Sequence, residues 1–278
     1  MTTPNAEQIA LWNERSGPRW VATQRLLDLQ LTPFGRVPME RLALRAGQRV
    51  LDVGCGCGAT TLDLASAVGP RGHVTGVDVS TVMLARARER AADLAHVDFV
   101  EADAQTHAFA DRYDALYSRF GVMFFDDPVG AFTRLRAALN PDAPLAFVTW
   151  RAPELNPWLT VPLAAALPLL AEAPKMAPPD APGPFGFANE SRVRGVLESA
   201  GFRDVRAEPL DLPMHLAGGG IDEALEVSLQ VGPCGQIVRE NPHLTVCLRE
   251  AIRNAFVPHL TPEGVVLGAA AWVYTARA

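Results

Sequence analysis

Three glycines at alternate positions follow a short apolar run early in the chain, in the segment Val50-Leu51-Asp52-Val53-Gly54-Cys55-Gly56-Cys57-Gly58. The apolar run Arg49–Val53 predicts a buried parallel strand. Apolar residues at helical spacing over Ala59–Val68 predict a helix directly after the glycines. Without β-carbons at every second position, the backbone can turn sharply and a ligand can lie directly on it. This order of strand, turn and helix indicates an open α/β sheet with a ligand site at the turn.

Two acidic residues bracket this turn. Asp52 precedes it, and Asp78 follows a second apolar run at 73–77. A carboxylate after the second strand can accept hydrogen bonds from both hydroxyls of a ribose. A carboxylate before the turn would repel a pyrophosphate but would suit a bound ammonium group. The spacing G-x-G-x-G also differs from the G-x-G-x-x-G of dinucleotide-binding proteins, so the pattern favours a nucleoside that carries an amino acid.

Several stretches of the chain resemble the class I S-adenosylmethionine-dependent methyltransferases. They are the glycine segment, Val74-Thr75-Gly76-Val77-Asp78-Val79-Ser80 with Met83-Leu84, Phe99-Val100-Glu101-Ala102-Asp103-Ala104, and Phe120-Gly121-Val122-Met123-Phe124-Phe125. The similarity is greatest to the small-molecule enzymes of ubiquinone and menaquinone biosynthesis. It covers residues 46–150 well and 189–211 loosely. It departs from the family at Cys57, where threonine is more common, and at the turn 140–144, which replaces a usual Pro-Gly-Gly.

The resemblance implies a binding mode for S-adenosylmethionine, with S-adenosylhomocysteine as the product. The glycine loop would hold the methionine part, Asp78 would bind the ribose, and Asp103 would border the adenine. An aromatic face attracts a sulfonium, which adds Trp20 as a further contact. The full set of expected cofactor contacts is Asp52, Gly54, Cys55, Gly56, Gly58, Asp78, Val79, Met83, Asp103, Ala104, Gln105, Ser118, Arg119 and Trp20.

The remaining pattern predicts a Rossmann-like α/β fold, with a seven-stranded, mostly parallel sheet and helices on both faces. Further strands are expected at 97–101, 113–118, 145–150, 203–212 and 264–276, and helices at 6–31, 81–94, 128–139 and 189–200. Residues 1–45 would form a helical N-terminal cap and residues 46–278 the methyltransferase-like domain. That domain would carry a proline-dense insertion at 151–188, interpreted as a lid, and a helical insertion at 213–263.

The acceptor is expected at the carboxyl ends of the fourth and fifth strands, because the cofactor should cover the first two. Methyl transfer from a sulfonium depends mainly on alignment, so the enzyme need not carry a catalytic motif. Weak catalytic candidates are His107, His215 and Arg119. Each has an ordinary structural alternative, namely a packed or solvated histidine or an arginine in an ion pair.

Charge and composition argue against several kinds of partner. With a net charge of −6, the chain has no basic face for nucleic acid or acidic membrane surfaces. Cys55 and Cys57 could bind a metal only with further ligands, and no second cysteine pair or nearby histidine supplies them. Asp126 and Asp127 could form a carboxylate metal site, but Asp127 is typical of a helix cap. No metal is therefore expected. The sequence has neither a signal pattern nor a membrane-spanning apolar run, which predicts a cytoplasmic protein and leaves a homodimer open.

We expect methyl transfer from S-adenosylmethionine to a small apolar or aromatic metabolite. Two alternatives remain open at this stage. One is an NAD-dependent oxidoreductase on a related sheet, and the other is a non-catalytic protein that binds S-adenosylmethionine. The residues identify neither the substrate nor the accepting atom.

Overall fold

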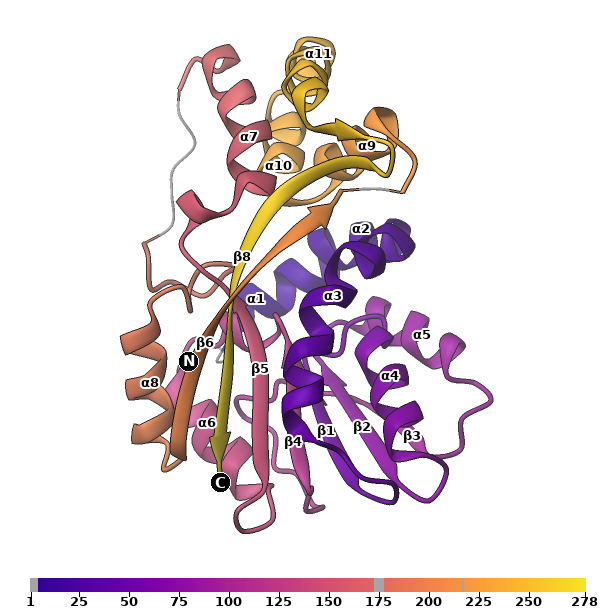
Figure 1. Cartoon of the computed structure of the whole chain (residues 1–278), viewed down its shortest axis with the longest axis vertical. Helices are drawn as coiled ribbons and strands as arrows, with labels where there is room; N and C mark the ends of the chain where they lie inside the picture. The colour runs from indigo at the N-terminus through magenta and orange to yellow at the C-terminus, as the bar shows by residue number, and fades with distance from the viewer. Residues whose placement is uncertain (1–4, 173–177, 217) are drawn as a thin grey trace.

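A mixed sheet forms the centre of the computed structural model, which describes residues 5–172, 178–216 and 218–278 (Figure 1). The strands lie in the order β3-β2-β1-β4-β5-β8-β6, and a short β7 pairs only with β8. Neighbours from β3 to β5 pair in parallel, whereas β8 is antiparallel to both β5 and β6. The strands are β1 Arg49–Val53, β2 His73–Asp78, β3 Val97–Glu101, β4 Ala115–Arg119, β5 Pro144–Trp150, β6 Arg203–His215, β7 Leu260–Thr261 and β8 Gly264–Arg277.

Helices cover both faces of this sheet, as the alternation of apolar strand residues requires. In β1, Val50 packs with residues of α3 and α4 on one face, while Leu51 packs into the larger cluster that contains α6 and α8. The helices around the sheet are α3 Gln24–Leu42, α4 Ala59–Val68, α5 Thr81–Arg90, the 3-10 turn η2 Val122–Phe124, α6 Pro128–Ala137 and α8 Glu190–Ser199. The predicted α/β architecture is therefore confirmed.

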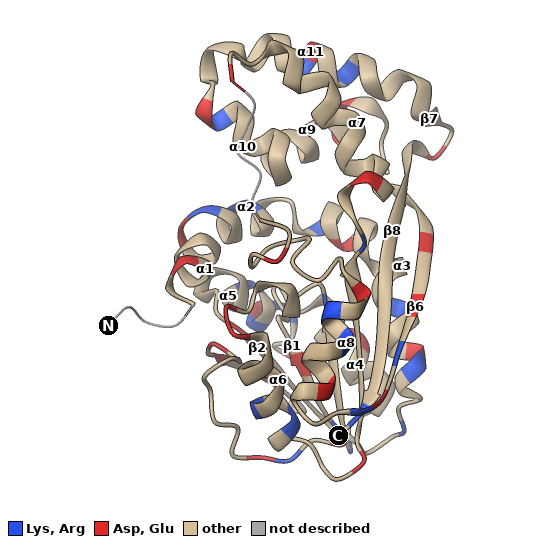
Figure 2. Ribbon diagram, turned by 90° about the vertical axis from the view of Figure 1, so that its left-hand side faces the viewer, with Lys and Arg blue, Asp and Glu red and all other residues tan. Residues whose placement is uncertain are grey.

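Two segments far apart in the sequence meet in one helical layer above the carboxyl edge of the sheet (Figures 1 and 2). The long strands β6 and β8 extend upward as a ribbon and carry it. The layer consists of η3 Pro153–Leu155, α7 Pro157–Ala166, η4 Leu167–Leu169, α9 Ile221–Gln230, α10 Gly232–Glu240, η5 Pro242–Leu244, α11 Thr245–Phe256 and η6 Val257–His259. The predicted lid thus contains α7, although residues 173–177 of it lie outside the described part.

The N-terminal helices differ from the prediction of one or two helices over 6–31. The chain forms α1 Ala6–Ala10, a π-helical turn η1 Leu11–Arg15, and α2 Ser16–Ala22, followed by α3. The break before α3 falls at Thr23, whose hydroxyl bonds the Arg19 carbonyl at 2.8 Å instead of pointing to solvent. Helix α3 then continues to Leu42 and packs on β4 and β5, because the Tyr117 hydroxyl donates to the Gly35 carbonyl at 2.8 Å.

Other boundaries shift for local reasons. Helix α5 ends at Arg90 rather than 94, because the Leu94 amide bonds the Ala91 carbonyl at 2.8 Å in a tight turn. Strand β6 runs to His215 rather than 212, because β8 continues beside it as far as Val266. Among the described residues, no helix is both long and apolar enough to cross a membrane.

Candidate functional site

The glycine loop joins β1 to α4 and holds each glycine in the left-handed region, with φ of +71° at Gly54, +54° at Gly56 and +79° at Gly58. A β-carbon at Gly54 would lie 2.6 Å from the Gly121 Cα, and one at Gly56 would lie 2.8 Å from the Met83 Cε. The loop therefore needs glycine both for its backbone conformation and for close approach. The Met83 side chain could move away from Gly56, whereas the Gly121 backbone cannot.

Asp52 lies fully buried beneath this loop. Strand alternation turns its side chain toward α4, where the hydroxyls of Thr60 and Thr61 each donate to Oδ2 at 2.7 Å. Oδ1 is buried and has no hydrogen-bond partner among the described residues. Burial raises the pKa of Asp52 to about 6, and the two threonine hydroxyls oppose that shift. A buried carboxylate with one unpaired oxygen is suited to bind a cation.

Asp78 ends β2 and closes the other side of the loop. Its Oδ2 accepts from the Gly56 amide at 2.8 Å, and its Oδ1 accepts from the Ser80 amide at 2.9 Å. Burial raises the pKa of this carboxyl, and the backbone N–H groups oppose the rise. A carboxylate offers about four acceptor sites, so two remain for the hydroxyls of a ligand.

Asp103 stands at the corresponding place after β3. Its Oδ1 accepts from the Gln105 amide at 3.0 Å and from the Asn5 side-chain amide at 3.3 Å. Its Oδ2 is buried without a partner in the described part of the chain. Ala104 is buried beside it, and the Gln105 Oε1 accepts from the Asp127 amide at 2.9 Å. This strand end, like that of β1, holds a carboxylate oxygen with unused hydrogen-bonding capacity.

The N-terminal helices are tethered over these strand ends (Figure 2). The Asn13 side chain donates to the Val79 carbonyl at 2.9 Å and accepts from the Thr81 amide at 3.0 Å. Next to it, the Ser80 hydroxyl donates to the Trp12 carbonyl at 2.9 Å. Both Trp12 and Asn13 belong to the π-helical turn η1, and such turns often mark functional sites. The backbone directly after Asp78 therefore holds this turn in place.

An aromatic group accompanies the tether. The Trp12 ring lies 5.3 Å from that of Phe124 and 5.7 Å from that of Trp20, centroid to centroid, and all three are half-buried. Trp20, an expected sulfonium contact, therefore packs edge-on against Trp12 in this structure.

Two expected cofactor contacts at the end of β4, Ser118 and Arg119, have polar partners within the chain. The Ser118 hydroxyl is buried, donates to the Val53 carbonyl at 2.7 Å and accepts from the Gly121 amide at 3.2 Å. Arg119, 10% exposed, forms an ion pair at 3.7 Å with Asp28, which lies on helix α3. Both side chains therefore help to hold the segments at the end of β4 in place.

The same Asp28 joins the glycine loop to α3. Arg90 of α5 pairs with Asp28 at 3.1 Å and donates to the Cys57 carbonyl at 2.8 Å. Burial raises the pKa of the Cys57 thiol to about 12, so this side chain stays protonated within the loop. Cys55 is equally buried, and burial raises its thiol pKa as well.

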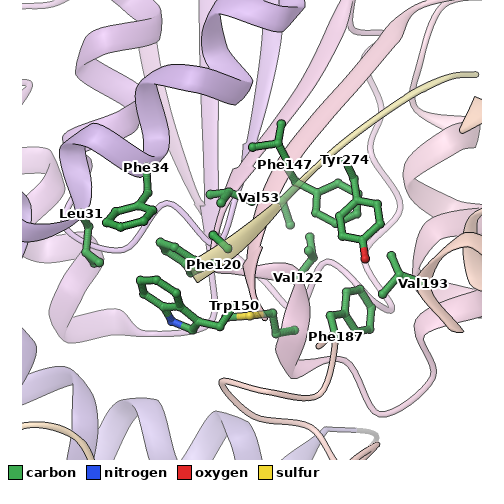
Figure 3. Packing of buried hydrophobic residues seen from close by; sticks show 14 of the residues in the cluster. Leu31, Phe34, Val53, Phe120, Val122, Phe147, Trp150, Phe187, Val193 and Tyr274 are labelled. Carbon is green, nitrogen blue, oxygen red and sulfur yellow. The ribbon is translucent and has the colours of Figure 1, made fainter. Parts of the chain in front are cut away.

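At the carboxyl ends of β4 and β5 the chain forms an aromatic wall, which we define as Phe34, Phe120, Trp150 and Trp158. Figure 3 shows the first three of these residues. Phe120 stacks on Trp150 at 4.0 Å with an interplanar angle of 16°, and Trp150 lies 5.2 Å from Phe34 and 5.0 Å from Trp158. Phe120 has φ of +59°, which is rare and strained for a bulky side chain. Such strain is found mostly at binding sites and catalytic sites.

Asn156 fixes the position of this wall relative to α7. It is fully buried, and its Oδ1 accepts from the Trp158 indole at 2.8 Å and from the Ala270 amide at 2.9 Å. Its amide donates to the carbonyls of Arg151 and Ala152. Helix α7 is thereby anchored to β8 at the point where β5 ends.

The weak catalytic candidates do not converge on one place. His107 is half-buried and packs its ring 4.8 Å from that of Phe109, in the segment after β3. His215 is exposed at the end of β6. Arg119 is held by Asp28, as described above.

No metal site is found in the described residues, where no cluster of three or more histidine, cysteine or acidic side chains could hold an ion. The two adjacent carboxylates have separate partners. Asp126 accepts from the Asn5 amide at 2.8 Å, and Asp127 caps α6 by accepting from the Gly130 amide at 2.9 Å.

Comparison with known proteins identifies the family. A model described as a methyltransferase domain matches residues 50–142. The aklanonic acid methyltransferase DauC of Streptomyces sp. (strain C5) is 34% identical over 149 residues, which are 49% of this chain and 68% of that protein. The chain belongs to the class I S-adenosylmethionine-dependent methyltransferases. A demethylmenaquinone methyltransferase of Listeria monocytogenes is 28% identical over 165 residues, or 58% of this chain and 70% of the relative.

Solved structures agree on the fold of this methyltransferase. Phosphoethanolamine N-methyltransferase 2 of Haemonchus contortus, in complex with S-adenosyl-L-methionine, gives a TM-score of 0.54 at 17% identity, with 88% of this chain and 52% of that chain covered. The chain therefore spans about half the length of that enzyme. The YcgJ protein of Bacillus subtilis gives 0.54 at 20% identity, with 87% and 96% covered. At such identities the likeness extends to the fold alone.

The methyl donor of this family fits the polar atoms of the site. Asp52 and Asp103 each have a buried carboxylate oxygen without a partner among the residues described, and Asp78 between them retains acceptor capacity. The donor carries an ammonium at one end, ribose hydroxyls in the middle and an exocyclic amine at the other, which are all hydrogen-bond donors. The chemical order of the ligand therefore matches the order of the strand ends.

Sequence reasoning missed several residues of this site. Thr60 and Thr61, which bond Asp52, stand in the first turn after the glycines and could have been identified by that position. No comparable signal marks Asn5, Asn13 or Asp28. Each contacts a residue of the site that lies more than 60 positions away in the sequence.

Proposed function

We propose that this methyltransferase binds S-adenosylmethionine along the carboxyl ends of β1, β2 and β3 and methylates a planar apolar acceptor beyond β4 and β5. The glycine loop and Asp52 would hold the methionine part, Asp78 the ribose and Asp103 the adenine. The observation that carries this assignment is the unpaired, fully buried Oδ1 of Asp52. A buried charge without a partner is expensive, and a ligand ammonium would supply the missing partner.

The aromatic wall supports a flat acceptor. Large rings stack on planar molecules and bind them without hydrogen bonds. The wall lies at the ends of β4 and β5, beside the loop that would hold the donor, since Gly121 directly follows Phe120 and touches Gly54. Helix α7 of the predicted lid would cover the acceptor from above. The relatives named for aklanonic acid and demethylmenaquinone also act on small molecules.

Alignment of the acceptor would be the main contribution of the protein to catalysis. When bound, S-adenosylmethionine supplies an electrophilic methyl group with its leaving group built in. Holding the two reactants in line can contribute roughly 7–11 kcal/mol. An acceptor hydroxyl or carbon that sheds its proton at neutral pH needs no protein base, which agrees with the scattered positions of His107, His215 and Arg119.

The test is a transfer assay with labelled S-adenosylmethionine and a panel of acceptors, divided into planar hydroxylated aromatics, aliphatic amines and carboxylic acids. We expect S-adenosylhomocysteine to form with members of the first group only. Asp52→Asn should reduce that turnover strongly. Asp98→Asn, a change on exposed β3 surface, is the matched control and should not. Turnover confined to the aliphatic amines would contradict the proposed acceptor class.

A homodimer stays a prediction of the sequence. Exposed apolar side chains on the helical layer support it, since Val246 is 76% exposed and Val257 is 55% exposed. Sedimentation analysis over a range of concentrations would test it, and a single monomeric species at all of them would contradict it.

A further inference from the structure

Asn5 occupies an unusual position directly before α1. Its side chain is only 4% exposed, and its backbone adopts the left-handed conformation, with φ of 59° and ψ of 18°. Few residues other than glycine adopt this conformation, and asparagine is the commonest of them. Its burial and backbone show that Asn5 is part of the packed structure.

The contacts of Asn5 place it between two strand-end segments. Its backbone amide donates to Asp126 Oδ2 at 2.8 Å, after β4, and its side-chain amide donates to Asp103 Oδ1 at 3.3 Å, after β3. Because the amide nitrogen faces Asp103, the orientation of the side chain is determined, and Oδ1 must point elsewhere. That Oδ1 is buried and has no partner in the described part of the chain.

Within the described residues, three acceptors on these segments therefore lack a donor. They are the Oδ1 of Asn5, the Oδ2 of Asp103 and the Oε1 of Gln8, which lies one helical turn beyond Asn5. Buried polar atoms are nearly always hydrogen-bonded, so a group of orphans indicates a missing partner. All three are oxygens that accept, and the missing partner must therefore be a donor. A carbonyl or a phosphate placed there would be repelled.

We propose that Asn5 and Gln8 complete the adenine site, and that together with Asp103 they recognise the exocyclic amine of the base. This inference rests on the proposed cofactor site. An exocyclic amine carries two N–H bonds, so it can donate to two of these three acceptors at once. The consequence is selectivity for adenine over hypoxanthine, in which a carbonyl oxygen replaces that amine.

Calorimetric titration with S-adenosylhomocysteine and with S-inosylhomocysteine tests this selectivity. Wild type should bind the adenine ligand at least about tenfold more tightly than the hypoxanthine ligand. Asn5→Gly keeps the left-handed backbone and removes the amide, so it should weaken binding of the adenine ligand about tenfold and change that of the hypoxanthine ligand little. Thermal unfolding of each variant shows whether the fold is kept.

Asn13→Ala is the matched control. It removes another tether of the N-terminal helices, to Val79 and Thr81, but no acceptor of the proposed adenine site. It should therefore weaken both ligands by the same factor. If Asn5→Gly also weakens both equally, or neither, Asn5 only holds the helix and our inference is wrong. If wild type binds neither ligand, the proposed cofactor site itself fails.

Discussion

The two halves of the site are built in different ways. The proposed donor half, at β1 to β3, consists of backbone amides and carboxylates. Two of these carboxylates have a buried oxygen without a partner in the part of the chain that the structure describes. The proposed acceptor half, at β4 and β5, consists of stacked rings, and its polar side chains Ser118 and Arg119 are already paired. A donor that never varies can be recognised atom by atom, whereas an acceptor recognised by ring stacking can change while the scaffold is kept. The comparison predicts that mutations in the two halves have separable effects.

The largest effect is expected at Gly54. Alanine there would combine a strained φ with a contact of 2.6 Å to the Gly121 backbone, so we expect loss of S-adenosylhomocysteine binding by roughly 100-fold or more. Gly47→Ala is the matched control, because Gly47 has φ of +89° but no neighbour within 4 Å of its β-carbon position. That variant should lose only about 1–2 kcal/mol of stability. Calorimetry and thermal unfolding measure both, and equal losses would show that close approach is unimportant.

Asp78→Ala should weaken S-adenosylhomocysteine binding by about 1–3 kcal/mol. It would leave the ribose hydroxyls of the proposed binding mode unpaired, and it would remove the acceptor of the Gly56 amide. The KM of the acceptor should stay unchanged when the donor is saturating. Such a result would show that the substitution affects only the donor half of the site. Wild-type affinity in this variant would show that the ribose lies elsewhere.

Asp52→Asn should act in opposite directions on binding and on stability. The folded pKa of about 6 lies above the unfolded value of 3.8, so Asp52 stabilises the fold below pH 3.8 and loses this contribution as pH rises through 6. At pH 8 we expect the asparagine variant, without ligand, to be more stable by about 1–3 kcal/mol, and at pH 4 to gain little. Its donor affinity should nonetheless fall, because the ammonium loses its partner.

The affinity of the wild-type protein for the methyl donor should depend on pH through the same carboxylate, that of Asp52. It should fall as pH drops through about 6, since protonated Asp52 no longer attracts an ammonium. Titrations of wild type and Asp52→Asn between pH 5 and 8 measure this. A variant that keeps the wild-type pH profile would assign the titration to another group.

The smallest effect is expected in the aromatic wall. Trp158→Leu should raise the KM of a planar acceptor roughly tenfold and leave S-adenosylhomocysteine affinity unchanged, because stacking area is lost only on the acceptor side. Trp272→Leu serves as the control. Trp150 pairs with Ala271 of β8, and Trp272 is the next residue along that strand, so its side chain faces the other side of the sheet. A change in donor affinity in Trp158→Leu would contradict the separation of the two halves.

Local patterns predicted the parts of this molecule that depend on neighbouring residues. The strand before the glycines, the helix after them and the helix cap at Asp127 all follow from a few adjacent side chains. Asp78 was placed beside the glycine loop for the same reason. Parallel strands bring their carboxyl ends to one edge, and the spacing along the chain indicates which residues meet there.

Contacts between distant segments could not be predicted in this way. Nothing near Asn5 indicates a left-handed backbone or a contact with Asp103, 98 residues away. Arg119 forms an ion pair with Asp28 of α3. The length of this helix is hard to predict because it contains Pro33 and Pro38. The partners of Trp150 come from α3, β4 and α7, and only the folded chain brings them together.

The contact between Gly54 and Gly121 limits how an enzyme like this one can be redesigned. Two bare backbones touch there, so no flexible side chain can absorb a displacement of either turn. If the turn after β4 were rebuilt to admit a bulkier metabolite, it would displace the glycine loop and so weaken the binding of the methyl donor. Acceptor specificity is better altered in the helical layer, where side-chain size can be changed without moving the contact between Gly54 and Gly121.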